Sequence, residues 1–78
     1  MRFTLRQLEL FVAVCETASI TLATEREHIS QSAASSAIAQ LERALGAQLL
    51  VRRHAHGVTP TPAGRQLLHR VRTVLREA

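Results

Sequence analysis

Apolar residues recur at helical spacing near the start of the chain. They lie three or four positions apart, at Leu5, Leu8, Phe11, Val12 and Cys15. This spacing predicts a first helix from about Leu5 to Glu16 that turns one face to a core. Thr4, followed three residues later by Gln7, has the spacing of a capping box at the start of that helix.

Two further helices are predicted after a short polar break. Thr21 is expected to cap a second helix that ends near His28. Ser30 then has the chemistry of an N-cap for a third helix, and Gly46 is expected to end it. The buried face predicted for the third helix consists of Ala33, Ala37, Ile38, Leu41 and Leu45. Two helices joined by three or four residues are typical of a helix-turn-helix.

The period of the pattern changes at Gln48. The segment 49–51 is apolar and favours a strand, the polar segment 52–57 ends in glycine and favours a turn, and Val58 and Thr59 resume the strand pattern. The sequence therefore predicts a small β-hairpin.

A fourth helix is expected to begin at Thr61, as N-cap, with Pro62 in the first helical position. Its apolar stripe consists of Leu67, Leu68, Val71, Val74 and Leu75. Such a stripe is longer than so small a core can cover, which favours dimerisation through this helix. No C-cap follows it, so we expect the natural chain to continue.

Together these elements predict a mainly α fold, the winged helix-turn-helix. Residues 1–60 would form a three-helix core with a β-hairpin wing, and residues 61–78 a truncated linker and dimerisation helix. A chain of 78 residues holds one small domain, which excludes a two-domain enzyme. No nucleophile, base and orienting group are assembled in the sequence, so we expect neither an enzyme nor a cofactor.

The charge is unevenly placed along the chain. The net charge is +4, and all ten basic residues are arginine. Six of these arginines, with only one glutamate, lie in residues 50–78. A basic C-terminal third favours a polyanionic partner. Only Phe3 and Phe11 are aromatic, which argues against stacking on single-stranded nucleic acid.

Cysteine and histidine suggest no further chemistry. The single cysteine, Cys15, excludes an internal disulfide and is interpreted as a small buried apolar residue. We expect a cytoplasmic protein without membrane contact, because neither a transmembrane segment nor a signal peptide is evident. His54 and His56 are a possible metal pair, but no third ligand accompanies them, so no metal site is predicted.

Several motifs resemble the N-terminal DNA-binding domain of LysR-type transcriptional regulators. They are Leu5-Arg6-Gln7-Leu8, Phe11-Val12-Ala13-Val14, Ile29-Ser30-Gln31-Ser32-Ala33, Gln40-Leu41-Glu42, Leu45-Gly46 and Thr61-Pro62-Ala63-Gly64. The resemblance covers nearly the whole chain. It implies a bacterial homodimer that binds a dyad-symmetric operator, with a tetramer as the alternative for the full-length protein. It also implies that a small-molecule effector binds a C-terminal domain absent from these residues.

The predicted function is sequence-specific binding of double-stranded DNA, with a recognition helix of about Ser30–Leu45 in the major groove and the wing on the backbone or in the minor groove. Gln31 is the best candidate to read a base, because its amide can donate to and accept from adenine. The residues predicted to contact DNA are Ser30, Gln31, Ser32, Ser35, Ser36, Gln40, Arg52, Arg53 and Arg65.

Plainer interpretations of the same residues stay open. The serines and Gln31 can simply cap and solvate a surface helix, and the arginines can be ordinary solvated charges, as we expect for Arg72 and Arg76. The alternative function is a winged-helix dimerisation or protein-docking module that does not bind DNA.

The chain also departs from the family's usual residues at four positions, namely Thr24, Glu27, Ser36 and Leu50. Glu27 stands where the family has leucine, so we expect a carboxylate facing the core, which costs several kcal/mol unless it is paired. Ser36 stands where the family commonly presents arginine to DNA, which supports the docking alternative.

Overall fold

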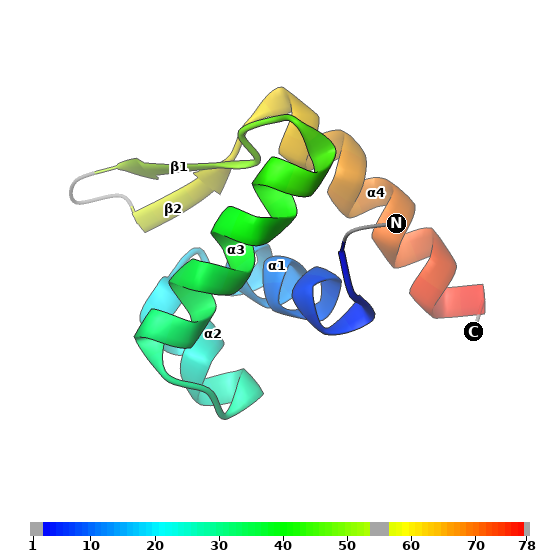
Figure 1. The fold of residues 1–78 in the computed structure, drawn as a ribbon. Coiled ribbons are helices and arrows are strands. Elements are labelled where there is room, and N and C mark those ends of the chain that lie inside the picture. The colour runs from blue at the N-terminus through cyan, green and yellow to red at the C-terminus, as the bar shows by residue number, and fades with distance from the viewer. Residues whose placement is uncertain (1–2, 54–56, 78) are drawn as a thin grey trace.

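The computed structural model describes residues 3–53 and 57–77. The elements run in the order α1 (Leu5–Thr17), α2 (Ile20–Glu27), α3 (Gln31–Leu45), β1 (Leu50–Arg53), β2 (Gly57–Pro60) and α4 (Pro62–Glu77) (Figure 1). The predicted winged helix-turn-helix is therefore confirmed. No helix in the described ranges is long and apolar enough to cross a bilayer.

The start of α1 is capped as predicted, but the start of α2 is not. The Thr4 hydroxyl accepts from the Gln7 amide at 3.1 Å, and the Gln7 side chain accepts from the Thr4 amide at 3.0 Å. In α2 the N-cap is Ser19, whose hydroxyl accepts from the Leu22 amide at 3.1 Å, so the prediction of Thr21 was wrong. Both residues are of capping type, and packing of Ile20 against the core sets the earlier start.

The buried face of α3 is turned by about one residue from the predicted one. Ala34, Ile38 and Leu41 are buried, whereas Ala33 and Leu45 are exposed. Alanines occupy several neighbouring positions of this helix, so the pattern alone did not distinguish Ala33 from Ala34. The largest fully buried side chains of the core are Leu10, Phe11, Val14, Leu41 and Leu49.

The hairpin is longer than predicted, because β1 continues through Arg53 and β2 begins at Gly57. Antiparallel pairing sets Arg52 opposite Val58 and Arg53 opposite Gly57. On a hairpin open to solvent, arginine side chains remain hydrated, so their polarity does not end the strand. The predicted turn thus contains three strand residues, Arg52, Arg53 and Gly57. His54 and His56 lie outside the described residues.

The hairpin joins the turn between α1 and α2 at its second strand. The Val58 amide donates to the Ala18 carbonyl at 3.0 Å. A Cβ on Gly57 would lie 2.3 Å from that carbonyl oxygen, and φ is +72° there, so this position requires glycine. The wing is fixed to the helical core at this point.

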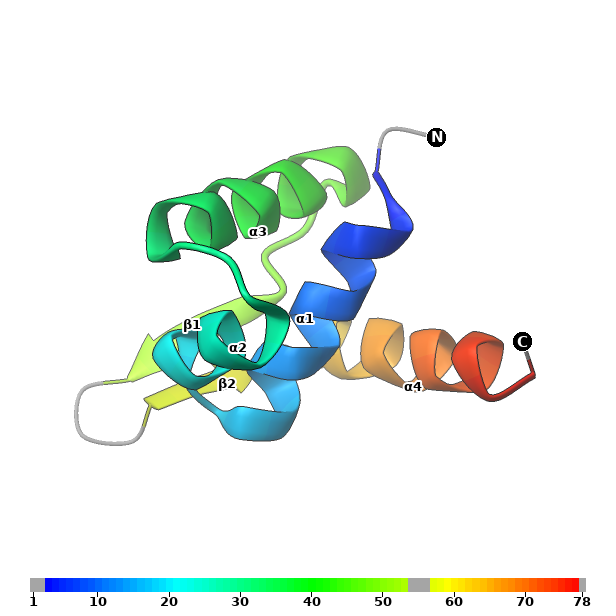
Figure 2. The same ribbon diagram turned by 90° about the horizontal axis from the view of Figure 1, so that it is seen from below.

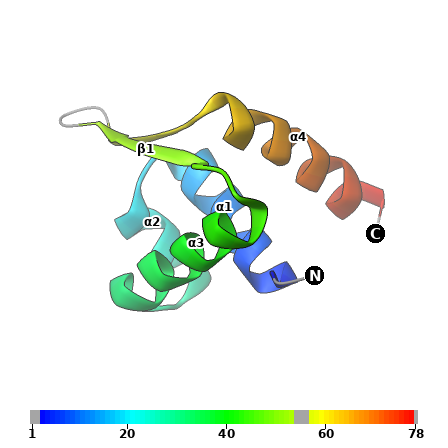
Figure 3. The ribbon, with the colours of Figure 1, turned by 45° about the horizontal axis from the view of Figure 1, so that its top comes forward.

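The helix α4 begins as predicted, since the Thr61 hydroxyl accepts from the Gly64 amide at 3.0 Å. Val71 is buried and Leu67 and Leu68 are half-buried, whereas Val74 and Leu75 expose 63% and 37% of their surface. Figures 2 and 3 show that α4 and the wing extend toward opposite ends of the molecule. The outer end of α4 therefore presents apolar side chains away from the wing.

Glu27, expected to face the core at a high cost unless paired, has ion-pair partners. Its side chain is half-buried and forms an ion pair with Arg6 of α1 at 2.7 Å and a longer one with Arg26 at 3.6 Å. Arg6 also donates to the Glu27 carbonyl. Arg6 approaches from the exposed face of α1, so the Glu27 carboxylate has a partner at the edge of the core.

Candidate nucleic-acid interface

The helices α2 and α3 form the helix-turn-helix, and a turn of three residues joins them. His28 ends α2 in the left-handed conformation at φ +60°, and Ser30 caps α3 by accepting from the Ala33 amide at 3.1 Å. The first turn of α3 is open, because Ser30, Gln31 and Ser32 are all exposed. The free amides at the start of a helix attract phosphate.

Gln31 is exposed, and its side chain is held by the preceding helix. Its Nε2 donates to the Thr21 hydroxyl of α2 at 2.8 Å. The amide oxygen and the second amide hydrogen are not used by this bond. Thr21 was not among the residues predicted to contribute to the site, because only the fold brings α2 beside the start of α3.

The outward face of α3 carries small and polar side chains. Ser32, Ser36 and Arg43 are exposed and lie opposite the buried stripe of the helix. Gln40 is also exposed, but its amide oxygen accepts from Gln7 of α1 at 2.9 Å. Arg43 was missed by the sequence analysis, and its position seven residues after Ser36 was the available signal.

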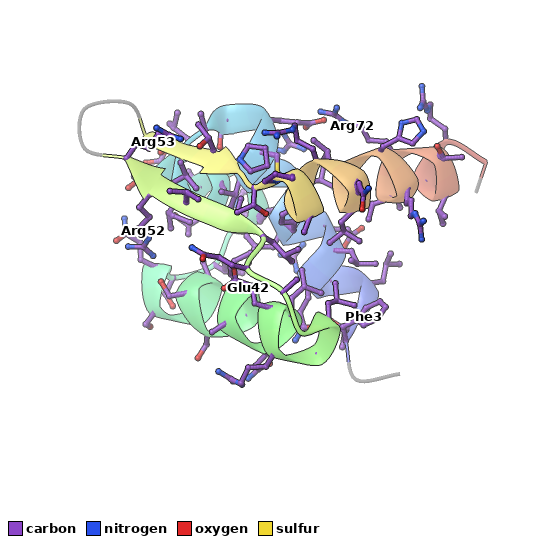
Figure 4. All side chains as sticks on the ribbon, turned by 90° about the horizontal axis from the view of Figure 1, so that it is seen from above. Phe3, Glu42, Arg52, Arg53 and Arg72 are labelled. Atoms are coloured by element: carbon purple, nitrogen blue, oxygen red, sulfur yellow. The ribbon has the colours of Figure 1, made fainter. Side chains whose placement is uncertain are left out.

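A hollow of about 220 Å³ separates α3 from the wing. Ser35 lines it from α3 and Arg52 lines it from β1. Figure 4 shows Arg52 extending toward α3, whereas Arg53 lies on the other face of the hairpin. Arg53 donates through Nε to the Thr59 hydroxyl at 3.3 Å. The two wing arginines thus point in different directions.

Glu42 connects the third helix to the base of the wing. Its carboxylate accepts from the Leu49 amide at 2.7 Å and from the Leu50 amide at 3.4 Å. These bonds satisfy backbone donors at the start of the hairpin and fix β1 relative to α3. The contact spans seven residues of sequence, and no local pattern indicated it.

The arginines divide into a paired group and an unpaired group. Ion pairs are formed by Arg6 of α1, Arg26 of α2 and Arg72 of α4. Two of them share Glu16, which lies 2.8 Å from Arg26 and 3.2 Å from Arg72. Hydrogen bonds from Arg26, and then from Arg72, lower the pKa of Glu16. Arg72 is therefore not the simple solvated charge that was expected.

The unpaired group lies on α3, on the wing and along α4. Among the described residues, six arginines have no described carboxylate within ion-pair distance, namely Arg43, Arg52, Arg53, Arg65, Arg70 and Arg76. Arg65 instead donates to the Pro60 carbonyl at 3.2 Å, at the base of the wing. Uncompensated positive charge is therefore present on the outward face of α3, on the wing beside it and along α4.

Cys15 is half-buried, and burial raises the pKa of its thiol to about 11. At neutral pH the thiol stays protonated, and a protonated thiol is a poor nucleophile. Cys15 thus behaves as the apolar residue that was predicted.

A helix-turn-helix with a wing and an uncompensated basic face defines the class of winged-helix nucleic-acid-binding folds. Residues 5–65 match the family described as bacterial regulatory helix-turn-helix protein, lysR family. The match covers most of the chain, so the chain belongs to this family and the resemblance seen in its motifs is confirmed.

Two curated relatives illustrate the similarity in sequence. The nitrogen assimilation regulatory protein nac of Klebsiella aerogenes is 45% identical over 73 residues, which are 94% of this chain and 24% of that protein. The transcriptional regulator EstR of Acinetobacter baylyi is 42% identical over 74 residues, 95% of this chain and 24% of that protein. The chain thus spans about a quarter of the length of these relatives.

Solved structures share the fold. The DNA-binding domain of CbnR in complex with DNA is 36% identical with a TM-score of 0.87, and the match covers 95% of this chain and 84% of that one. The BenM DNA-binding domain in complex with the catB site 1 DNA is 37% identical with a TM-score of 0.89, covering 96% and 82%.

Proposed function

We propose that this domain binds double-stranded DNA sequence-specifically and reads the operator of a bacterial transcription regulator. The helix α3 enters the major groove, and the wing contacts the backbone or the minor groove. The observation that carries the proposal is the open face of α3 together with Arg43 on that face and Arg52 and Arg53 on the wing, none of which has a carboxylate partner in the described ranges. Family membership and the DNA complexes of the two structural neighbours support it.

The residues take different roles in this proposal. Gln31, Ser35 and Ser36 face base edges, with Gln40 further along the helix. Ser30 and Ser32 hold a phosphate at the helix start, because the free amides and the helix dipole favour an anion there. Arg52, Arg53 and Arg65 contact the DNA backbone, and such contacts position a protein without reading sequence.

The proposed active form is a homodimer. Val74 and Leu75 are exposed on α4, beside an apolar hollow of about 230 Å³ that Leu67 and Val71 also line. A second copy of α4 would cover these side chains. Two copies related by a twofold axis would bind a dyad-symmetric operator in the bacterial cytoplasm. In a longer protein, a C-terminal domain would bind a small-molecule effector. The tetramer would be an assembly of that longer protein.

A titration of this chain against duplex DNA at several salt concentrations tests DNA binding. On a plot of log affinity against log salt concentration, the slope should be about −0.9 for each phosphate that the protein neutralises. Arg52→Ala with Arg53→Ala should weaken binding to every duplex and flatten that slope. Arg76→Ala removes a like charge from the far end of α4 and serves as the control.

The docking alternative makes the opposite prediction for the same titration. A module that only dimerises or docks to protein would bind duplex DNA weakly, and the wing variants would bind no differently from the Arg76 control. Gln31→Ala adds a test of specificity, because loss of a base contact should cost about 1–3 kcal/mol on the preferred site and little on random duplex.

A further inference from the structure

One contact in the helix-turn-helix is not needed to build the fold. Thr21, in the first turn of α2, accepts a hydrogen bond from the Gln31 amide at 2.8 Å. Ser19 caps α2, so the Thr21 hydroxyl has no capping role. Both Thr21 and Gln31 are exposed, so the bond does not satisfy a buried polar group.

Each end of this hydrogen bond is attached to well-fixed backbone. The Thr21 carbonyl accepts from the Thr24 hydroxyl at 2.7 Å, and the adjacent Ala23 is fully buried. Gln31 directly follows Ser30, whose hydroxyl caps α3. The bond therefore holds a long side chain between two rigid helices.

We propose that Thr21 is a positioning residue for base recognition, which holds the Gln31 amide ready to read a base. This inference rests on the proposed function. A free glutamine must lose the freedom of three side-chain torsions before it can form two bonds to one base. Thr21 occupies only one amide hydrogen of Gln31, so the oxygen and the other hydrogen stay available as an acceptor and donor pair for adenine.

The expected loss of affinity without the Thr21 hydroxyl equals the cost of fixing the Gln31 side chain when DNA binds. Immobilising a side chain of this length on binding costs enough to lower affinity by about two- to tenfold. That loss should fall on sequence-specific binding alone, because random duplex offers Gln31 no matching base. A change at Thr21 should therefore alter the ratio of specific to random affinity and leave random affinity unchanged.

The test compares two substitutions at position 21. Thr21→Val keeps the shape of the side chain and removes the acceptor oxygen, whereas Thr21→Ser keeps the oxygen and is the matched control. The probes are the duplex that the wild-type chain enriches from a randomised library and a scrambled duplex of equal composition. Thr21→Val should lower the affinity ratio about two- to tenfold, and Thr21→Ser should preserve it. Thermal unfolding of each variant establishes that it is folded at the assay temperature.

A double-mutant cycle with Gln31→Ala separates positioning from direct contact. In the Gln31→Ala background, Thr21→Val should change the affinity for neither the selected duplex nor the scrambled one. Equal weakening on both duplexes, or an effect that persists without Gln31, would show that Thr21 contacts the DNA backbone itself and would overturn the proposal. An unchanged ratio would also overturn it. If the wild-type chain binds no duplex, the proposed function fails and this inference fails with it.

Discussion

Gly64 lies where α4 passes closest to the base of the wing, and replacing it with alanine should destabilise the domain. A Cβ at this position would lie 2.1 Å from the Leu49 carbonyl oxygen and 3.1 Å from Cβ of Pro60. Carbon atoms attract best at about 3.5–4.0 Å, so the added methyl group must move the two segments apart by roughly 1 Å. The Leu49 backbone cannot yield easily, because its amide donates to Glu42 at 2.7 Å and its carbonyl accepts from the Thr61 amide at 3.0 Å.

The expected cost is at the upper end of the range for overpacking, about 3 kcal/mol. A gain in helix propensity of up to about 1 kcal/mol offsets part of the strain. A domain of 78 residues has a total stability of roughly 4–12 kcal/mol. Urea unfolding followed by circular dichroism should therefore show a large decrease in the midpoint for Gly64→Ala.

Gly46→Ala is the matched control for this prediction. Gly46 ends α3 at φ +66°, and a Cβ there would meet no heavy atom within 4 Å. Its replacement costs only the strain of the left-handed conformation, about 1 kcal/mol. If Gly64→Ala is as stable as Gly46→Ala, α4 and the wing base do not approach each other as closely as described.

Three further changes test the ion pairs, the dimer and the recognition face. Arg26 and then Arg72 lower the pKa of Glu16 in the folded protein. The ionised Glu16 therefore stabilises the fold at pH values above its unfolded pKa, and this stabilisation is lost as the pH falls. Glu16→Gln should reduce the thermal stability of the domain at pH 7 but not at pH 3. Leu75→Arg should shift sedimentation at high concentration toward monomer, whereas unchanged sedimentation would argue against the α4 interface. Ser36→Arg should tighten binding to general duplex and steepen the salt slope by up to about 0.9 per new phosphate contact; an unchanged slope would show that position 36 does not face DNA.

The helices and the hairpin could be predicted because local sequence determines them. Apolar spacing located α1, and a side chain of capping type with the right spacing fixed its first turn at Thr4. Where two capping residues competed, as at Ser19 and Thr21, packing of the neighbouring Ile20 decided between them. The sequence pattern holds no information on that packing.

The finer parts of the candidate site depend on contacts between elements. Glu42 reaches backbone amides at the base of the wing, and Gln31 reaches Thr21 of the preceding helix. Glu27 is paired because the fold brings Arg6 from the exposed side of α1. Each of these contacts links two elements at an angle that single-element periodicity does not specify.

A methylation-interference experiment tests most directly whether α3 lies in the major groove. Guanine N7 faces that groove, so its methylation blocks a helix that enters there. With the duplex selected by the wild-type chain, interference is expected in two patches, centred a whole number of helical turns apart, as a twofold dimer requires. Gln31→Ala should lower affinity without moving the patches. Binding that is indifferent to N7 methylation would contradict recognition of the major groove by α3.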